Sequence, residues 1–293
     1  MQARILSRIL APMMLLGANV AGAVSLSASG MGQVLIYPYY TVNKGQDTLI
    51  SVVNASDVGK ILEVDFVEGY NGREVLKFIL LLSAHDVWTA AISQTADDGG
   101  ATMRTSDKSC TDPLIPTDGV AFRSGAYDGT GPVPADEGPQ GITRTREGFI
   151  EIFTLGDIPP GSATETAITH VQNGTPGAGV PPGCATLNAN TYYSEGITPT
   201  TGLFGSGSIV NVGQGTFFAY NADALADFTD VPLLSPDASV HHFMQDANSA
   251  EAVNGVATSY TYDAQGRPIA TDWAFGIDAV SAALMVLIAQ QKL

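Results

Sequence analysis

Apolar and polar residues alternate most clearly between positions 33 and 93. Five short segments rich in β-branched and aromatic residues follow one another there, separated by breaks that contain Gly, Asn, Asp or Ser. The segments are Gln33–Thr41, Thr48–Asn54, Ile61–Glu68, Glu74–Leu82 and Asp86–Ser93. Each has the length of a strand, and the breaks are typical of tight turns. The pattern therefore predicts an antiparallel meander onto which the rest of the chain packs.

Two of these segments predict finer detail. Pro38 has no N–H to donate to a neighbouring strand, so the first segment is expected to lie at a sheet edge or to contain a bulge. In the third segment, Val64 and Phe66 alternate with Glu63 and Asp65. This alternation predicts a strand with one apolar face and one solvated face that carries the acids.

The remaining chain predicts more strands and two long insertions. Residues of about 95–140 and 156–202 are rich in Gly, Pro, Asp and Thr, which indicates loops. Further elements are a strand at Gly148–Leu155, a hairpin of Ser208–Val212 with Thr216–Tyr220, a turn or short helix at Asp223–Asp230, weak β-structure at Ala250–Tyr262 and a helix at Asp278–Lys292. We therefore expect an all-β fold: one antiparallel β-sandwich, Ig-like or jelly-roll-like, over residues 24–293, with long loop insertions and a short C-terminal helix.

The first 23 residues have the pattern of a secretory signal peptide. Arg4 and Arg8 precede the short apolar stretch Ile9–Val20, and Ala21-Gly22-Ala23 supplies the small residues of a cleavage site. The sequence thus predicts export to the periplasm, cell surface or medium, with no membrane span in the mature chain. Val24–Gly32 is expected to be a flexible lead-in.

Composition and charge restrict the partners. Only 14% of the residues are charged, while Gly (32) and Pro (16) are plentiful, which suits turn-rich β-structure. The formal net charge is −16, and no Lys or Arg occurs from Glu147 to Gly266. A phosphate backbone would be repelled, so nucleic acid is excluded as a partner.

The two cysteines, Cys110 and Cys184, fall in the two loop insertions. An even number of cysteines in an exported chain predicts a disulfide bond between them, which would tie the insertions together.

No strong catalytic motif is present. Ser206 and Ser208 lie in a Gly-rich stretch, but neither has the G-x-S-x-G pattern of a nucleophile elbow, and the Walker lysine is missing. His241 and His242 are adjacent, and adjacent strand residues point to opposite faces, which disfavours a shared metal ion.

Calcium is the better-suited ion because acidic residues gather in two loops. The candidate ligands are Asp97, Asp98, Asp223, Asp227 and Asp230. Neither loop has the spacing of a known calcium motif, and turn formation explains Asp-Gly clusters equally well. We therefore expect no resident cofactor.

Five segments support a family resemblance. They are GQVLIYPYYTVNKGQDTLISVVNAS, GYNGREVLKFILLLSAHDVWTAAI, TREGFIEIFTLGDI, GSGSIVNVGQGTFFAYNADAL and GIDAVSAALM. In this order they resemble a family of exported proteobacterial proteins that are labelled only "cell surface protein" and have no established activity. Members of that family continue into further strands after the last segment. The resemblance thus implies that this chain, which stops at Leu293, lacks its C-terminal strands and leaves a sheet edge open.

These observations favour a non-enzymatic surface or extracellular protein with a structural or adhesive role. It would bind other surface components or copies of itself, as an oligomer or polymer formed by strand addition between the lead-in and an open edge.

Two alternatives stay open. A glycan- or small-ligand-binding module would need an exposed aromatic platform, for which the candidates are Tyr37, Tyr39, Tyr40, Tyr192 and Tyr193. Half-buried strand tyrosines explain the same residues. A hydrolase that uses acidic residues would need two carboxylates to converge in a cleft.

Overall fold

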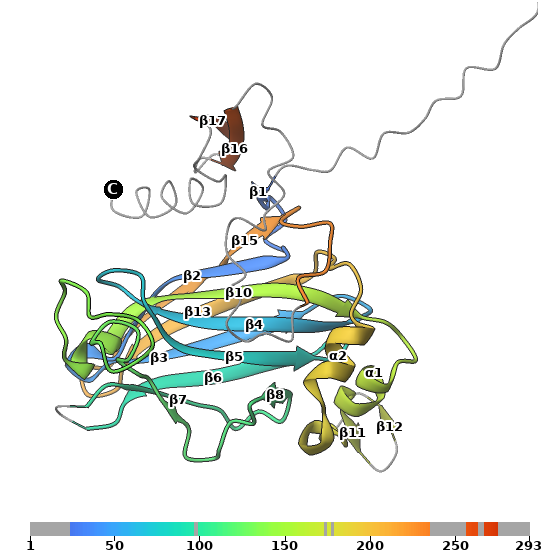
Figure 1. Ribbon diagram of the computed structural model, residues 1–293, viewed down its shortest axis with the longest axis horizontal. Helices are drawn as coiled ribbons and strands as arrows, with labels where there is room; N and C mark the ends of the chain where they lie inside the picture. The colour runs from blue at the N-terminus through green and yellow to red at the C-terminus, as the bar shows by residue number, and fades with distance from the viewer. Residues whose placement is uncertain are drawn as a thin grey trace, which may run out of the picture.

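The computed structural model describes residues 24–96, 99–172, 175–176, 179–234, 256–262 and 267–274. Its strands form two packed, predominantly antiparallel sheets (Figure 1), so the predicted β-sandwich is confirmed. Sheet A contains, in spatial order, β17 (Pro268–Ala274), β16 (Val256–Tyr262), β1 (Ser25–Leu26), β15 (Asp223–Ala226), β2 (Val34–Thr41), β10 (Glu147–Ile158), β4 (Gly59–Glu68), β5 (Glu74–Leu82) and β8 (Cys110–Asp112). Sheet B contains β14 (Thr216–Asn221), β13 (Leu203–Asn211), β3 (Asp47–Asn54), β6 (Val87–Gln94), β7 (Ala101–Arg104) and β9 (Val120–Ala121).

The helical elements among the described residues are short and lie in the connections. They are α1 (Ala163–Ile168), α2 (Ala189–Glu195) and three 3-10 turns, η1 (Asn43–Gly45), η2 (Ile142–Arg146) and η3 (Cys184–Thr186). A small hairpin of β11 (Val171–Gln172) and β12 (Thr175–Pro176) lies beside α1 (Figure 1). The insertion at 156–202 therefore contains two helices where loops were predicted, and the insertion at 95–140 contributes β7, β8 and β9 to the sheets.

The five predicted strands of residues 33–93 are all present, but the predicted meander is wrong. Only β4 and β5 pair with each other as a hairpin. β2 pairs with β10 and β15, while β3 pairs with β6 and β13 in the other sheet. The breaks between the strands mostly carry the chain from one sheet to the other. A turn signal in the sequence marks where a strand ends, and it does not show which sheet the next strand joins.

Pro38 lies at a bulge inside sheet A, one of the two expected outcomes. Gly148 is opposite Tyr40 and Ile150 is opposite Tyr37, so β2 has one extra residue between them. β15 accompanies β2 only at Val34–Ile36, which leaves the proline beyond that pairing. The missing N–H therefore costs no ladder hydrogen bond.

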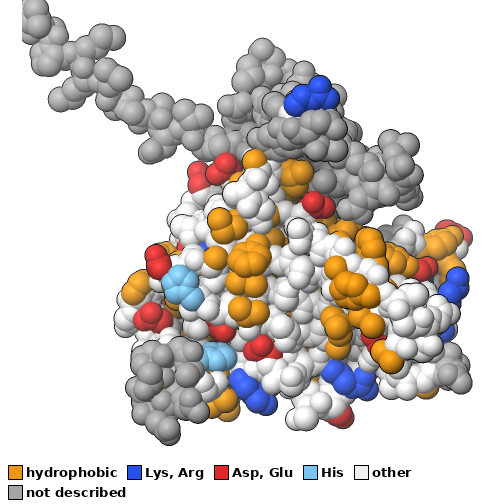
Figure 2. Space-filling model, turned by 180° about the vertical axis from the view of Figure 1, so that it is seen from behind, with side chains coloured by type: hydrophobic (Ala, Val, Ile, Leu, Met, Phe, Trp, Pro, Cys, Tyr) orange, Lys and Arg blue, Asp and Glu red, His pale blue; other side chains and the backbone are white. Residues whose placement is uncertain are grey.

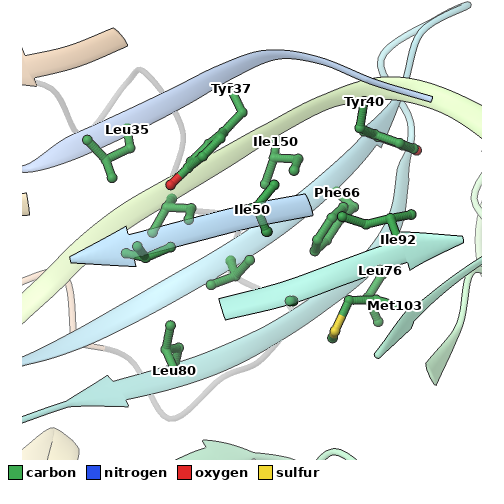
Figure 3. Close-up of a cluster of buried hydrophobic side chains, with 14 of the residues drawn as sticks. Leu35, Tyr37, Tyr40, Ile50, Phe66, Leu76, Leu80, Ile92, Met103 and Ile150 are labelled. Atoms are coloured by element: carbon green, nitrogen blue, oxygen red, sulfur yellow. The ribbon is translucent and has the colours of Figure 1, made fainter. Parts of the chain in front are cut away.

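The main core fills the space between the two sheets (Figure 3). Side chains from alternate positions of both sheets meet there, as the period of two requires. Its members include Leu35, Tyr37, Tyr40, Ile50, Phe66, Leu76, Leu80, Ile92, Met103 and Ile150. Because all of these are buried, this layer supplies the largest share of the hydrophobic stabilisation.

Sheet A is covered on its other face as well. Ile61, Phe153 and Leu155 point away from sheet B and pack with Ile168 and Tyr192 of α1 and α2 in a second apolar cluster. All ten residues of β4 are buried. The alternation predicted for this strand is correct, but the solvated face predicted for Glu63 and Asp65 is wrong, because the chain covers it.

A buried ion pair fastens the covering segment to sheet A. Lys60 of β4 and Asp157 of β10 approach to 2.7 Å, with side chains 0% and 1% exposed. The Lys60 ammonium also donates to the carbonyl of Thr200 at 2.9 Å, and the N–H of Thr200 donates to Asp157 at 3.1 Å. Burial lowers the pKa of Lys60, while Asp157 favours its charged form.

The later strands match the sequence unevenly. The predicted β13–β14 hairpin and the β10 strand are confirmed. In the segment Asp223–Asp230, where a turn or short helix was expected, the first four residues form strand β15, and the supposed lead-in contains β1, which pairs with β15. Val24 is 1% exposed, so this segment is not a free donor strand. The predicted signal peptide and the predicted helix at 278–292 lie outside the described residues.

Arg144 holds the first insertion against the β4–β5 turn. Its guanidinium donates to both carboxylate oxygens of Glu68 at 2.8 and 2.9 Å, and to both of Asp136 at 2.7 Å. The rings of Tyr70 and Tyr127 lie 5.0 and 4.2 Å from its central carbon. The side chain is 3% exposed. Only a planar, forked cation can satisfy this geometry.

We predict that Arg144→Ala lowers the free energy of unfolding by about 3 kcal/mol, because it leaves the Glu68 carboxylate buried without its cation. Arg144→Lys restores the charge without the fork and should recover less than half of the loss. Urea unfolding followed by circular dichroism measures both. Arg123→Ala, at an exposed arginine, is the control, and an Arg144→Ala loss as small as the control's would contradict this role.

Candidate functional site

The acidic residues expected on a solvated face form a buried row on the outer face of sheet A. Glu151, Asp65 and Lys77 are directly opposite one another on β10, β4 and β5. Glu63 lies two residues before Asp65 and therefore on the same face. The Lys77 ammonium is 2.9 Å from Glu63 Oε1 and 3.9 Å from Asp65 Oδ1. Glu63, Asp65 and Glu151 are only 3%, 2% and 4% exposed.

Asp65 and Glu151 in this row have raised pKa values. Burial raises the pKa of Asp65 well above its ordinary value, and the nearby Glu63 carboxylate adds to the effect. Burial also raises the pKa of Glu151 to about 7. Neither carboxylate oxygen of Asp65 has a hydrogen-bond partner in the described structure. Burial thus disfavours the charged forms of Asp65 and Glu151, and only Glu63 and Asp65 lie within 4.0 Å of the Lys77 ammonium.

The row contains the converging carboxylates that the hydrolase hypothesis requires, but it lacks the required cleft. A glycoside hydrolase must admit a substrate and a water molecule between its two carboxyl groups. Side chains that are 2–4% exposed are closed to such a substrate. We therefore assign the row to the packing of sheet A and not to catalysis.

The tyrosines expected to form an aromatic platform are mostly internal. Tyr37, Tyr40 and Tyr192 are at most 1% exposed. The Tyr37 hydroxyl donates to the carbonyl of Ser51 at 2.7 Å. Tyr193 packs edge-on against Tyr192, and Tyr39 alone of the five is well exposed, at 42%. The predicted platform is wrong, and the half-buried alternative describes these residues better.

The Gly-rich stretch around Ser206 and Ser208 serves packing. A Cβ at Gly205 would collide with the Tyr37 hydroxyl, and one at Gly207 would collide with the ring of Tyr220. These glycines face the core while the serines point outward from β13. The lack of a nucleophile elbow or phosphate loop, noted from the sequence, thus has a structural counterpart: glycine makes room for tyrosine rings.

The β13–β14 hairpin places an aromatic strand at the edge of sheet B. β14 pairs with β13 from Asn221 to Thr216, and no other described strand pairs with it. Phe217 and Phe218 are 68% and 62% exposed. Tyr220 fixes the strand from the inner side, because its hydroxyl donates to the carbonyl of Tyr39 in sheet A. The edge is therefore anchored before any partner arrives.

The described residues leave most of the outer face of sheet B uncovered. Along β3 and β13 buried positions alternate with partly or fully exposed ones, in contrast to the fully buried β4. Seen from behind (Figure 2), apolar side chains are spread over the middle of this side, and most acidic side chains lie towards its periphery. Exposed Leu49, Val87 and Phe204 lie on it. The sequence did not predict this exposed face, because apolar and polar residues alternate along the strands of both sheets.

The remaining predicted site residues are dispersed. Asp223 is partly buried in β15, whereas Asp227 and Asp230 are exposed. Within the described ranges no group of three or more His, Cys, Asp or Glu side chains is arranged to hold a metal ion. Asp97, Asp98, His241 and His242 lie outside those ranges.

The predicted disulfide bond is present between Cys110 and Cys184. It joins β8 at the edge of sheet A to η3 in the second insertion, as expected. The hydroxyl of Tyr192 donates to Asp112 of β8 at 2.8 Å and adds a second link to the same strand.

Comparison with known proteins gives no match to a family model, a curated protein or a solved structure. In the part of the chain that the structure describes, no helix has the length and apolar character needed to cross a membrane.

We predict that Glu151 makes stability depend on pH. Its ordinary pKa is 4.5 and its folded pKa is about 7, so the folded chain binds more protons than the unfolded chain between these values. The contribution of Glu151 to the free energy of unfolding is therefore fully present below about pH 4.5, and it is lost as the pH rises through about 7. Glu151→Gln should therefore stabilise the protein by up to about 3 kcal/mol at pH 8 and have little effect at pH 4.

Urea unfolding at the two pH values measures this difference. Glu147→Gln, at the exposed start of the same strand, is the matched control for the substitution itself. Equal effects of Glu151→Gln at pH 4 and pH 8 would show that the carboxyl group ionises normally in the folded state.

Proposed function

We propose that this chain is an exported, non-enzymatic protein with a structural or adhesive role, whose copies associate through strand β14. The observation that carries the proposal is the uncharged edge Thr216–Asn221 with its two exposed phenylalanines. An edge strand presents a row of N–H and C=O groups that a second strand can pair with.

The other sheet ends among the described strands are better protected. β8 and β9 have three and two residues, and β17 contains Pro268 and Asp272. Short length, proline and charge are the usual ways of blocking edge-to-edge pairing. β14 has six residues and none of these devices. It is the edge at which pairing is least opposed.

The distribution of charge favours association of two copies through β14 over association through another part of the surface. With a net charge of −16, two copies repel one another wherever acidic groups meet. Antiparallel pairing of β14 with β14 brings together Thr, Phe, Ala, Tyr and Asn only. Such a contact is self-complementary, so it closes at two copies. It would join two six-stranded sheets into one of 6 + 6 = 12 strands.

Export is supported indirectly. Disulfide bonds persist in oxidising compartments, and Cys110 and Cys184 are paired. The signal-peptide pattern of residues 1–23 makes the same prediction from the sequence. A structural or adhesive role also agrees with the closed acidic row, because the converging carboxylates are not accessible to a substrate.

We predict that the mature, disulfide-bonded chain forms dimers, and that Phe217→Lys combined with Phe218→Lys makes it monomeric. The lysines remove both exposed rings and bring four positive charges close together in the proposed pairing. Sedimentation velocity over a range of concentrations measures the mass, and circular dichroism verifies the fold.

Val212→Lys is the control, since Val212 is 81% exposed at the tip of the same hairpin but lies outside the paired strand. A parent protein that stays monomeric at its highest soluble concentration would refute the association. Dimers that survive the double substitution would place the contact elsewhere.

A further inference from the structure

A groove of about 730 Å³ crosses the uncovered face of sheet B. Its floor is formed by β13, β3 and β6, and one wall is formed by the segment that follows β7 together with Ile115 and Thr117. The floor is low because its side chains are small. Across the three strands they form two rows: Ser206, Ser51 and Thr89 in one, and Ser208, Leu49 and Ala91 in the other.

The wall is built by local hydrogen bonds and a covalent link. The Thr105 hydroxyl donates to the carbonyl of Thr89 at 2.6 Å, which ties the wall to the floor. Asp107 Oδ1 accepts from the backbone N–H of Ser109 at 2.9 Å. Cys110, which follows directly, is held by its disulfide bond to Cys184. The groove is therefore formed before any ligand arrives.

The lining has an unusual charge for this protein. It contains Arg104, Lys108 and Asp107, so its net charge is 2 − 1 = +1, in a chain of −16. Arg104 is held at the rim, since it donates to the Asp118 carbonyl at 3.0 Å and to Ser93 Oγ at 2.9 Å. Lys108 is exposed and forms no ion pair with the described residues.

We propose that this groove binds an acidic oligosaccharide, with a sugar carboxylate at Lys108 and Arg104. Serine and threonine hydroxyls both donate and accept hydrogen bonds, which matches the hydroxyls of a sugar. Leu49, 45% exposed, and Ile115 offer apolar surface for the C–H face of a pyranose ring. The carboxylate of a sugar acid is negative, so the acidic surface of the protein repels it. The positively charged lining of the groove attracts it.

A bare phosphate ion fits the groove less well. It would occupy the cationic end and leave the two hydroxyl rows and Leu49 without a partner. A polymeric phosphate, such as a nucleic acid, would extend over the acidic surface around the groove. The combination of hydroxyls, small apolar side chains and a single excess positive charge therefore points to a sugar acid.

The test is isothermal titration of the mature chain with a tetramer of galacturonate, a tetramer of glucose and inorganic phosphate, in calcium-free buffer. We expect saturable binding of the galacturonate tetramer, weaker binding of the neutral tetramer and no competition by phosphate at equal concentration. Lys108→Glu should weaken the galacturonate complex at least about tenfold, because it removes a charge-assisted contact and adds repulsion. Lys44→Glu, an exposed lysine outside the groove, should leave it unchanged.

The Phe217→Lys, Phe218→Lys double variant separates this site from the proposed dimer, and it should bind the tetramer as the parent does. Three results would overturn the proposal: no binding of the galacturonate tetramer, full competition by phosphate, which indicates a general anion site, or equal losses for Lys108→Glu and Lys44→Glu, which indicate general electrostatic attraction.

Discussion

The contact between the two inner sheet faces is the interaction on which everything else depends. Strands that are adjacent in sequence are distributed over both sheets, so neither sheet can form from one continuous segment. Tyr37 shows how closely the layers are fitted, because its hydroxyl reaches the Ser51 carbonyl through the space that Gly205 leaves free. This packing determines which side chains of each strand point to the outer face of its sheet. The outer faces of the two sheets differ in how far they are buried.

The second face of sheet A is buried, whereas the second face of sheet B stays largely exposed among the described residues. The insertion with α1 and α2 closes over sheet A, held by the hydrogen bonds of Thr200 to the Lys60–Asp157 pair and by the Cys110–Cys184 bond. Acidic groups enclosed there, such as Asp65, are shielded from solvent and from any substrate. The uncovered face of sheet B offers the β14 edge and the groove beside it. The β14 edge and the groove therefore belong to sheet B, whereas the buried carboxyl groups lie on the outer face of sheet A.

Much of the fold could be predicted from the sequence, because strand positions depend on local patterns. The segments around Ile50, Val64 and Phe78 were located to within two residues by their alternation and their turn residues. Sheet membership depends on distant partners, which is why the meander was wrong and why Glu63 and Asp65 were expected in solvent. No local pattern distinguishes a strand whose polar face is solvated from one whose polar face is later covered by an insertion.

The candidate surface was harder to predict than the fold, for a physical reason. Phe217 and Phe218 resemble core residues in the sequence, since alternation and β propensity alone would bury at least one of them. They are exposed on β14, which lies at the edge of sheet B and pairs with β13 alone among the described strands. Their exposure has a cost that a monomer would normally avoid. An edge that is anchored by Tyr220, free of charge and apolar on both sides is more consistent with a partner strand than with solvent, and this consideration favours a contact protein over an isolated domain.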